Sequence, residues 1–228
     1  MTSPKRTVLA FDLYGTLLST ESIAEKLAEY LALKEDRASR VSGGGLYKSF
    51  SEVTRNSLQH ALAEHQVDLD QGSTQRLMEG YDCLSAFPDI SSCLLRLAHN
   101  PSLMPVVFSN GTISMISNSV LRSRDLSPYA SIFRDIISVD PVKKFKPAPE
   151  TYWHLADTAG KDRSQMDEMW LISSNPFDVM GAVNVGMKTA WVDRTGLGWI
   201  DSMSGEIRPL VVARDLNEAV RAIESREY

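Results

Sequence analysis

Residues 8–17 read VLAFDLYGTL, an apolar run followed by an aspartate and a glycine turn. A short apolar run of this kind predicts a buried β-strand, and Gly15 supplies the turn that follows it. Asp12 is therefore expected at the carboxyl end of the first strand. Open α/β sheets bind their ligands at that edge, so the stretch places a carboxylate where chemistry is expected.

Four more apolar runs predict strands further along the chain. The five predicted strands are Val8–Phe11, Met104–Ser109, Ile136–Val139, Trp170–Ser173 and Thr189–Val192. Segments with helical spacing separate the last four, and strands that alternate with helices are typical of a parallel sheet. We expect an α/β fold whose core is a Rossmann-like parallel sheet with helices on both faces.

The segment between the first two predicted strands contains no convincing strand. Apolar residues three and four apart predict amphipathic helices over Ser22–Leu33, Leu46–His65 and Gly72–Leu84. We expect residues 18–88 to form a helical cap domain inserted after strand 1, and residues 1–17 and 89–228 to form the catalytic core. The glycine run at residues 42–45 fits either a loop between helices or a mobile part of the active-site rim.

Composition restricts the classes of partner. The chain has 228 residues, 43% of them hydrophobic, which suffices for one α/β domain and a small second module. A net charge of −5 and a pI of about 5.4 give no support for nucleic-acid or membrane partners. No apolar run approaches the roughly 20 residues of a membrane span, and no apolar segment typical of a secretory signal precedes the first strand.

These features predict a soluble, cytoplasmic protein. The two cysteines, Cys83 and Cys93, fit a reducing compartment and are not in metal-binding spacing. We expect both of them to be buried or half-buried packing thiols.

The second predicted strand also ends in polar residues. Ser109 and Asn110 would stand at the same sheet edge as Asp12, where a hydroxyl and an amide can donate hydrogen bonds to an anion. A helix is predicted from Thr112 onward, and its N-terminal amides favour negative charge. On its own, the segment fits a plain strand-to-helix turn equally well.

A lysine, a tyrosine and an aspartate occur near the later strands. Lys146-Pro147 is predicted to enter a helix, because proline suits the first helical turn. A lysine beside Asp12 would neutralise carboxylates and orient a substrate, whereas Tyr152 fits either a site role or core packing. Asp178 is predicted in the first turns of the helix after the fourth strand, where Gly181 permits close packing on the sheet.

Four motifs in this order resemble the L-2-haloacid dehalogenase family of the haloacid dehalogenase superfamily. The likeness runs along most of the chain, and the tail at residues 191–196 is also similar. The matching residues are Asp12, Tyr14, Gly15 and Thr16 in the first motif, Ser109-Asn110-Gly111 in the second, residues 138–142 with Lys146-Pro147 and Tyr152 in the third, and Ser173-Ser174-Asn175 with Asp178, Gly181 and Ala182 in the fourth.

The resemblance implies a hydrolytic dehalogenase that converts (S)-2-haloacids to (R)-2-hydroxyacids. Asp12 would attack C2, expel halide with inversion and form an aspartyl ester. Lys146 and Thr16 would hold Asp12. Asp178, with Asn175 and Ser173, would position and deprotonate the water that cleaves the ester.

The resemblance also implies a substrate site that needs neither a cofactor nor a metal, and a homodimer. The substrate carboxylate would lie against Ser109 and the amides near Leu13 and Tyr14, with Tyr152 in the same site. Halide would be stabilised by Asn110, Tyr14 and an arginine. The family carries that arginine in a Trp-Arg segment of the cap, but no Trp-Arg precedes Tyr47 here. Arg40 and Arg37 each fit either a replacement that reaches the site from a different loop or a plain surface charge.

Two alternative functions remain on sequence grounds. A phosphatase of the superfamily would keep Asp12 but would have a second aspartate at the place of Tyr14 and acids near Ser174 and Asn175 to hold magnesium. Because a hard divalent cation needs several oxygen ligands, these replacements argue against a metal site. The missing Trp-Arg leaves room for a non-catalytic relative that binds a small anion.

Overall fold

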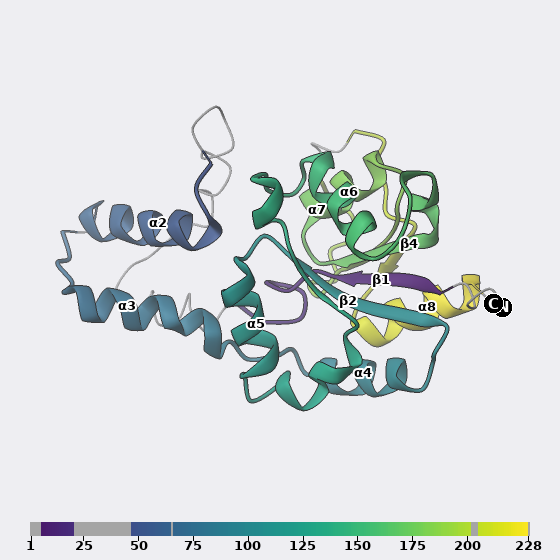
Figure 1. The fold of residues 1–228 in the computed structure, drawn as a ribbon, viewed down its shortest axis with the longest axis horizontal. Helices are drawn as coiled ribbons and strands as arrows, with labels where there is room; N and C mark the ends of the chain where they lie inside the picture. Colours follow the sequence, from purple (N-terminus) through teal and green to yellow (C-terminus); the bar gives the residue numbers. More distant parts are fainter. Residues whose placement is uncertain (1–5, 21–46, 65, 202–204, 228) are drawn as a thin grey trace.

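A computed structural model describes residues 6–20, 47–64, 66–201 and 205–227. In these residues the chain forms a parallel six-stranded sheet in the order β3-β2-β1-β4-β5-β6, with helices packed around it (Figure 1). The strands are β1 (Thr7–Phe11), β2 (Leu103–Ser109), β3 (Ile136–Ser138), β4 (Met169–Ser173), β5 (Lys188–Val192) and β6 (Val211–Ala213). The predicted Rossmann-like parallel sheet is confirmed.

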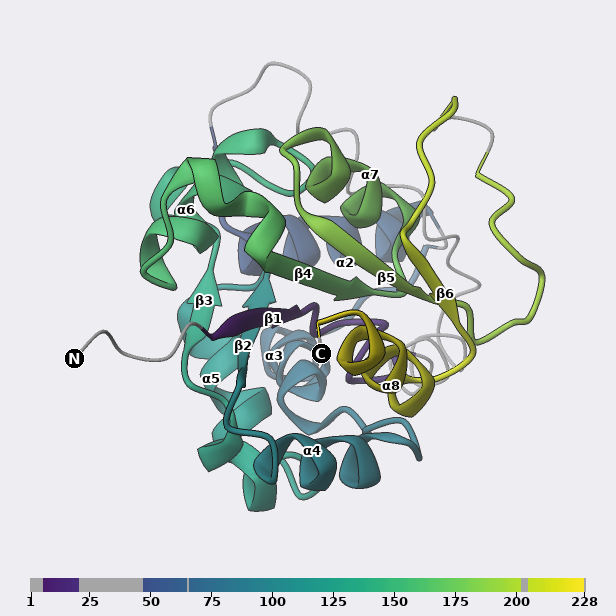
Figure 2. The ribbon, with the colours of Figure 1, turned by 90° about the vertical axis from the view of Figure 1, so that its right-hand side faces the viewer.

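Helices cover both faces of the sheet, because alternate strand residues are apolar on each side. In β1, Val8 and Ala10 belong to one core cluster, while Leu9 and Phe11 belong to the other. Figure 2 shows α6 and α7 on one face and α4, α5 and α8 on the other. These helices are α4 (Ile90–Ala98), α5 (Ile113–Leu121), α6 (Pro149–Thr158), α7 (Pro176–Asn184) and α8 (Leu216–Glu227).

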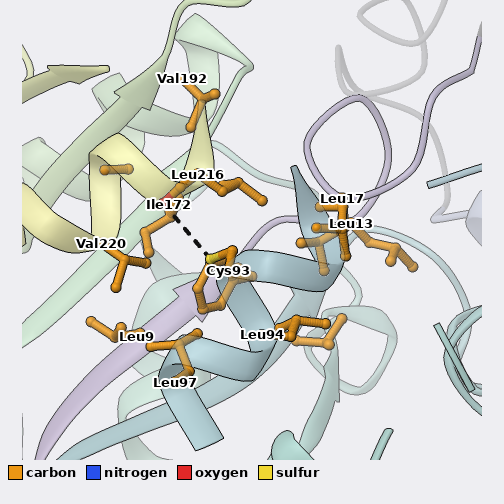
Figure 3. Packing of buried hydrophobic residues seen from close by; sticks show 14 of the residues in the cluster. Leu9, Leu13, Leu17, Cys93, Leu94, Leu97, Ile172, Val192, Leu216 and Val220 are labelled. Atoms are coloured by element: carbon orange, nitrogen blue, oxygen red, sulfur yellow. Dashed lines mark hydrogen bonds between the residues drawn. The ribbon is translucent and has the colours of Figure 1, made fainter. Parts of the chain in front are cut away.

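The core cluster under α4 and α8 contains a cysteine. Cys93 is buried between these helices and the sheet, and its Sγ lies 3.7 Å from the carbonyl oxygen of Leu216 (Figure 3). Burial raises the pKa of this thiol to about 12, so it stays protonated. Cys93 is a packing thiol as predicted. The prediction was wrong for Cys83, which is exposed because it ends a 3₁₀ turn at the molecular surface.

A helical insertion follows β1, as predicted. In the described residues it comprises α2 (Phe50–Glu64), α3 (Gln71–Glu79) and a 3₁₀ turn at Gly80–Cys83, and α2 and α3 project from one end of the sheet (Figure 1). A small apolar cluster of Leu58, Ala61, Leu62 and Met78 holds the two helices together. The helix expected over Ser22–Leu33 and the glycine run at residues 42–45 lie outside the described residues.

Several predicted bounds were wrong. The strand Val211–Ala213 was missed, since it is only three residues long, although the apolar run at residues 210–213 was its signal. The helix predicted over Gly72–Leu84 ends at Glu79, where a tighter 3₁₀ turn begins. The helix predicted over Leu46–His65 begins only at Phe50.

The helix that follows the predicted lysine motif also begins later than expected. Lys146-Pro147 precedes α6, which begins at Pro149, and Ala148 before it has an extended backbone. A residue that precedes proline is disfavoured in the helical region, which explains the late start. Lys146 therefore lies in a loop. Among the described helices, none is long and apolar enough to cross a membrane.

Candidate active site

The carboxyl ends of three neighbouring strands bring predicted site residues to one edge of the sheet. Asp12 follows β1, while Ser109 and Ser173 are the last residues of β2 and β4, which pair with β1 on either side. The chain turns to opposite sides of the sheet at this point, so the site lies at a topological switch point. Sites in open α/β folds are commonly found there.

Lys146 joins two carboxylates at this edge. Its Nζ lies 3.0 Å from Oδ1 of Asp12 and 2.8 Å from Oδ2 of Asp178, and it donates a further bond to the carbonyl oxygen of Phe108. The side chain is 1% exposed. Burial lowers the pKa of Lys146, but the two carboxylates outweigh it and the net shift is upward. Lys146 therefore stays an ammonium between two acids.

The two oxygens of Asp12 have unequal surroundings. Oδ2 accepts from Asn175 Nδ2 at 2.7 Å, from Thr16 Oγ1 at 2.9 Å and from Ser173 Oγ at 3.4 Å. Among the described residues, Oδ1 accepts only from Lys146. One oxygen is thus held by three neutral donors, while the other keeps acceptor capacity for a reacting partner.

Asp178 lies in the first turn of α7, as predicted, and is completely buried. Tyr152 on α6 donates to its Oδ1 at 2.8 Å and to its carbonyl oxygen at 3.0 Å. Burial raises the pKa of Asp178, while Lys146 and the Tyr152 hydroxyl oppose the rise. A carboxylate with a raised pKa is suited to accept a proton near neutral pH.

Tyr152 lies behind Asp178 in this arrangement. We predicted Tyr152 as a substrate-binding residue. In the structure its ring is fully buried and its hydroxyl donates to Asp178. Gly181, one turn after Asp178, makes this contact possible, because a Cβ there would overlap the Tyr152 hydroxyl. The sequence indicated that Gly181 packs closely on the sheet. The close approach is instead to Tyr152 and Pro147.

Donors for an anion surround the same edge. Ser109 is buried and accepts from the Gly111 amide, and Asn110 Oδ1 accepts from the Lys146 amide. No described backbone carbonyl accepts from the amides of Leu13 or Tyr14. Thr112 begins α5 as its N-cap, so the predicted helix start is confirmed. The Ser109 hydroxyl and the amides of Leu13 and Tyr14 can therefore donate hydrogen bonds to an anionic ligand.

Tyr14 links the site to the helical insertion. Its ring stacks on Phe50 of α2 with centroids 5.9 Å apart, and its hydroxyl is buried with no hydrogen-bond partner among the described residues. Burial raises the pKa of this phenol, which remains a neutral donor. Sequence reasoning did not single out Phe50, although two aromatic residues lie three positions apart at Tyr47 and Phe50. Arg37 and Arg40 lie outside the described residues.

The donor set does not suit a divalent cation. No group of three His, Cys, Asp or Glu side chains in the described part of the chain is arranged to hold a metal ion. The position between Asp12 and Asp178 is already filled by the Lys146 ammonium.

The chain is similar to several known proteins. A family model described as haloacid dehalogenase-like hydrolase matches residues 7–186. Over 203 residues the chain is 30% identical to haloacetate dehalogenase H-2 of Moraxella sp. (strain B), covering 84% of this chain and 87% of that protein. Over 222 residues it is 28% identical to an (S)-2-haloacid dehalogenase of Xanthobacter autotrophicus, covering 91% and 84%.

The folds agree as well. The solved structure of L-2-haloacid dehalogenase from Xanthobacter autotrophicus superposes with a TM-score of 0.81 and 25% identity, covering 96% of this chain and 98% of that one. The family match spans the strands that carry Asp12, Ser109 and Ser173 and extends past Asp178. The chain therefore belongs to the haloacid dehalogenase-like hydrolases.

Proposed function

We propose that this protein is a hydrolytic dehalogenase that converts (S)-2-haloacids to (R)-2-hydroxyacids with inversion at C2. The observation that carries the proposal is the buried Lys146 ammonium between Asp12 and Asp178, with Tyr14 in place of a second acid. This arrangement provides a charged nucleophile and a separate base without a metal. The names of two relatives, a haloacetate dehalogenase and an (S)-2-haloacid dehalogenase, support dehalogenation of a haloacid.

In the first step, Asp12 displaces the halide. Oδ1 attacks C2, a C–O bond forms, and the C–X bond breaks with its electron pair leaving on the halide. Lys146 holds Oδ1 in place, while the substrate carboxylate binds to Ser109 and the amides of Leu13 and Tyr14. Attack from the face opposite the halide inverts C2 and leaves an ester on Asp12.

In the second step, water cleaves that ester. Asp178 takes a proton from the water, whose oxygen attacks Cγ of Asp12. Oδ2 is then the ester carbonyl oxygen, and its three donors stabilise the negative charge that develops there. The Cγ–Oδ1 bond breaks, the departing alkoxide takes the proton from Asp178, and the new acid on Asp12 loses one proton.

The leaving halide is assigned to donors on the insertion side of the site. Asn110, whose Oδ1 is fixed by the Lys146 amide, keeps its amide hydrogens for a ligand, and Tyr14 brings a hydroxyl. Arg40 completes the halide site in this proposal.

We assign residues 18–88 to the cap and residues 1–17 and 89–228 to the core. We also assign the protein to the cytoplasm. We expect it to be a homodimer, and size-exclusion chromatography with light scattering tests that oligomeric state.

The first experiment compares two chemistries on one preparation. Halide release is measured from L- and D-2-chloropropionate with EDTA present, beside phosphate release from p-nitrophenyl phosphate with magnesium. We expect halide from the L-form alone, with D-lactate as product and none from Asp12→Asn. Phosphate release without halide would assign the site to phosphatase chemistry, and neither activity would favour an anion-binding relative.

A second experiment separates the two steps. Asp178→Asn keeps the shape of the side chain but removes its basicity, so the ester should form and persist. Intact-mass analysis after incubation with L-2-chloropropionate should then show the adduct, and a peptide map should place it on Asp12. Wild-type protein turned over in ¹⁸O-water should carry the label on the same residue, and label found only in lactate would contradict attack at Cγ.

A further inference from the structure

Arg194 connects the nucleophile turn to two distant segments. It follows β5 in the tail at residues 191–196, which the proposed mechanism does not use. Its Nη2 donates to the carbonyl oxygen of Thr16 at 2.9 Å. The same guanidinium donates to both oxygens of Asp89, at 2.9 and 3.3 Å, and lies 3.8 Å from the ring centroid of Phe87.

These partners lie where the chain returns from the helical insertion. Phe87 and Asp89 precede α4, and Oδ2 of Asp89 also accepts from the amide of Leu216 at the start of α8. The side chains of Arg194 and Asp89 are only 18% and 11% exposed. Because two parallel hydrogen bonds join the guanidinium of Arg194 to the carboxylate of Asp89, this largely buried ion pair fixes the orientation of both side chains.

Thr16 is the member of this network that touches the nucleophile. Its side chain donates to Oδ2 of Asp12 and accepts from the amide of Ser174, and it is fully buried. Arg194 holds the carbonyl oxygen of the same residue. Thr16 is thus fixed from both its side chain and its backbone, and a shift of its backbone would move the hydroxyl off Asp12.

The backbone that carries Arg194 is itself well anchored. The Asp193 carboxylate accepts from the amides of Gly196 and Gly198 and from the Thr195 hydroxyl. The Asp193 amide donates to the carbonyl oxygen of Ala213 in β6. Arg194 therefore projects from a fixed point, which a residue needs in order to position another.

We propose that Arg194 is a positioning residue, which holds the Thr16 backbone so that the Thr16 hydroxyl and the Asp12 carboxylate keep their reactive geometry, and which ties that turn to the chain leaving the insertion through Asp89. The inference rests on the proposed dehalogenase reaction. It also requires a guanidinium: the ammonium of a lysine could not bind Asp89 through a planar fork, stack on Phe87 and reach Thr16 together.

The kinetic test uses Arg194→Ala and Arg194→Lys beside Arg214→Ala. Arg214 is a matched control, since it also pairs with an acid but is 86% exposed. Both Arg194 variants should lose about 10²-fold in kcat on L-2-chloropropionate, the loss that a misplacement of about 1 Å can cause, with KM little changed. Guanidinium ion at a non-denaturing concentration should restore part of the kcat of Arg194→Ala and leave Arg214→Ala unaffected.

A second measurement does not depend on dehalogenation. Hydrogen exchange should become faster at the amides of Leu17 and Leu18, which bond within the nucleophile turn, in Arg194→Lys but not in Arg214→Ala. A folded Arg194 variant with wild-type kcat and wild-type exchange would overturn the proposal, as would a change in KM alone. If the wild type releases no halide, the proposed function fails, and the exchange result alone decides whether Arg194 orders the turn.

Discussion

The hydroxyl of Tyr152 donates a 2.8 Å hydrogen bond to Oδ1 of Asp178 from the neighbouring helix. The Tyr152 hydroxyl is held in its protonated form, because burial raises its pKa and the adjacent carboxylate adds to the rise. The bond stabilises the charged form of Asp178, which burial destabilises. Tyr152 therefore lowers the pKa of Asp178, the residue that we assign as the base.

Replacing Tyr152 by phenylalanine should shift the acid limb of the kcat–pH profile to higher pH. The loss of the hydrogen bond raises the pKa of Asp178 further, so the base is protonated over a wider range. The measurement is kcat against pH with L-2-chloropropionate under saturating substrate. Tyr129→Phe, in the 3₁₀ turn at Ser127–Ile132, is the control and should leave the profile unchanged. A shift to lower pH would contradict the assignment.

Gly181→Ala should destabilise the fold by about 1–3 kcal/mol, the usual cost of overpacking a close contact. The new Cβ would overlap the Tyr152 hydroxyl and ring and also Pro147. Urea unfolding at neutral pH measures the change. Because the nearest overlap is with the Tyr152 hydroxyl, which phenylalanine lacks, Gly181→Ala should cost less in a Tyr152→Phe background than alone. Strict additivity of the two changes would mean that the overlap is relieved elsewhere.

The sequence predicted correctly which candidate residues lie at the carboxyl ends of strands. Asp12, Ser109 and Ser173 each end or follow an apolar run, and parallel pairing brings such ends to one edge. It failed where partners come from separate helices or loops. The approach of Gly181 to Tyr152 depends on how two helices pack, and the contact of Arg194 with Thr16 spans 178 positions. Neither contact has a local periodicity that a sequence pattern can show.

Local sequence patterns also could not predict where short strands and turns begin and end. The strand Val211–Ala213 exists because it pairs with β5, and three residues are too few for an alternating pattern to be read. The exposed position of Cys83 follows from a 3₁₀ turn that replaces the last part of a predicted helix. In both cases tertiary contacts decide between local alternatives that the sequence leaves nearly equal.

Tyr47→Phe should weaken the contact between the insertion and the core. The Tyr47 hydroxyl donates to Oδ1 of Asp140 at 2.7 Å, and Lys143 lies over the same ring. The lost bond should cost about 0.5–1.5 kcal/mol of unfolding free energy, and limited proteolysis near residue 47 should become faster. Tyr129→Phe again provides the control. Unchanged cleavage rates would show that the tilted ring contact of Tyr47 with Phe145 holds this part of the insertion without the hydroxyl.

Lys146→Met should destabilise the protein by about 3–5 kcal/mol at neutral pH, since it leaves two buried carboxylates without their cation. The pKa of Asp178 is already raised by burial, and the loss of Lys146 removes a group that lowers it. Above the unfolded value of 3.8 the native variant then binds more protons than the unfolded chain, so its stability rises as pH falls toward that value.

The measurement is urea unfolding of Lys146→Met and wild type at a series of pH values from neutrality down toward 3.8, the ordinary aspartate pKa. The difference in unfolding free energy between wild type and Lys146→Met should become smaller as pH falls. Lys144→Met, which changes an exposed neighbour in the same loop, is the control and should show a constant gap. If the gap for Lys146→Met is constant or widens toward acid pH, Lys146 does not hold Asp178 in its charged form.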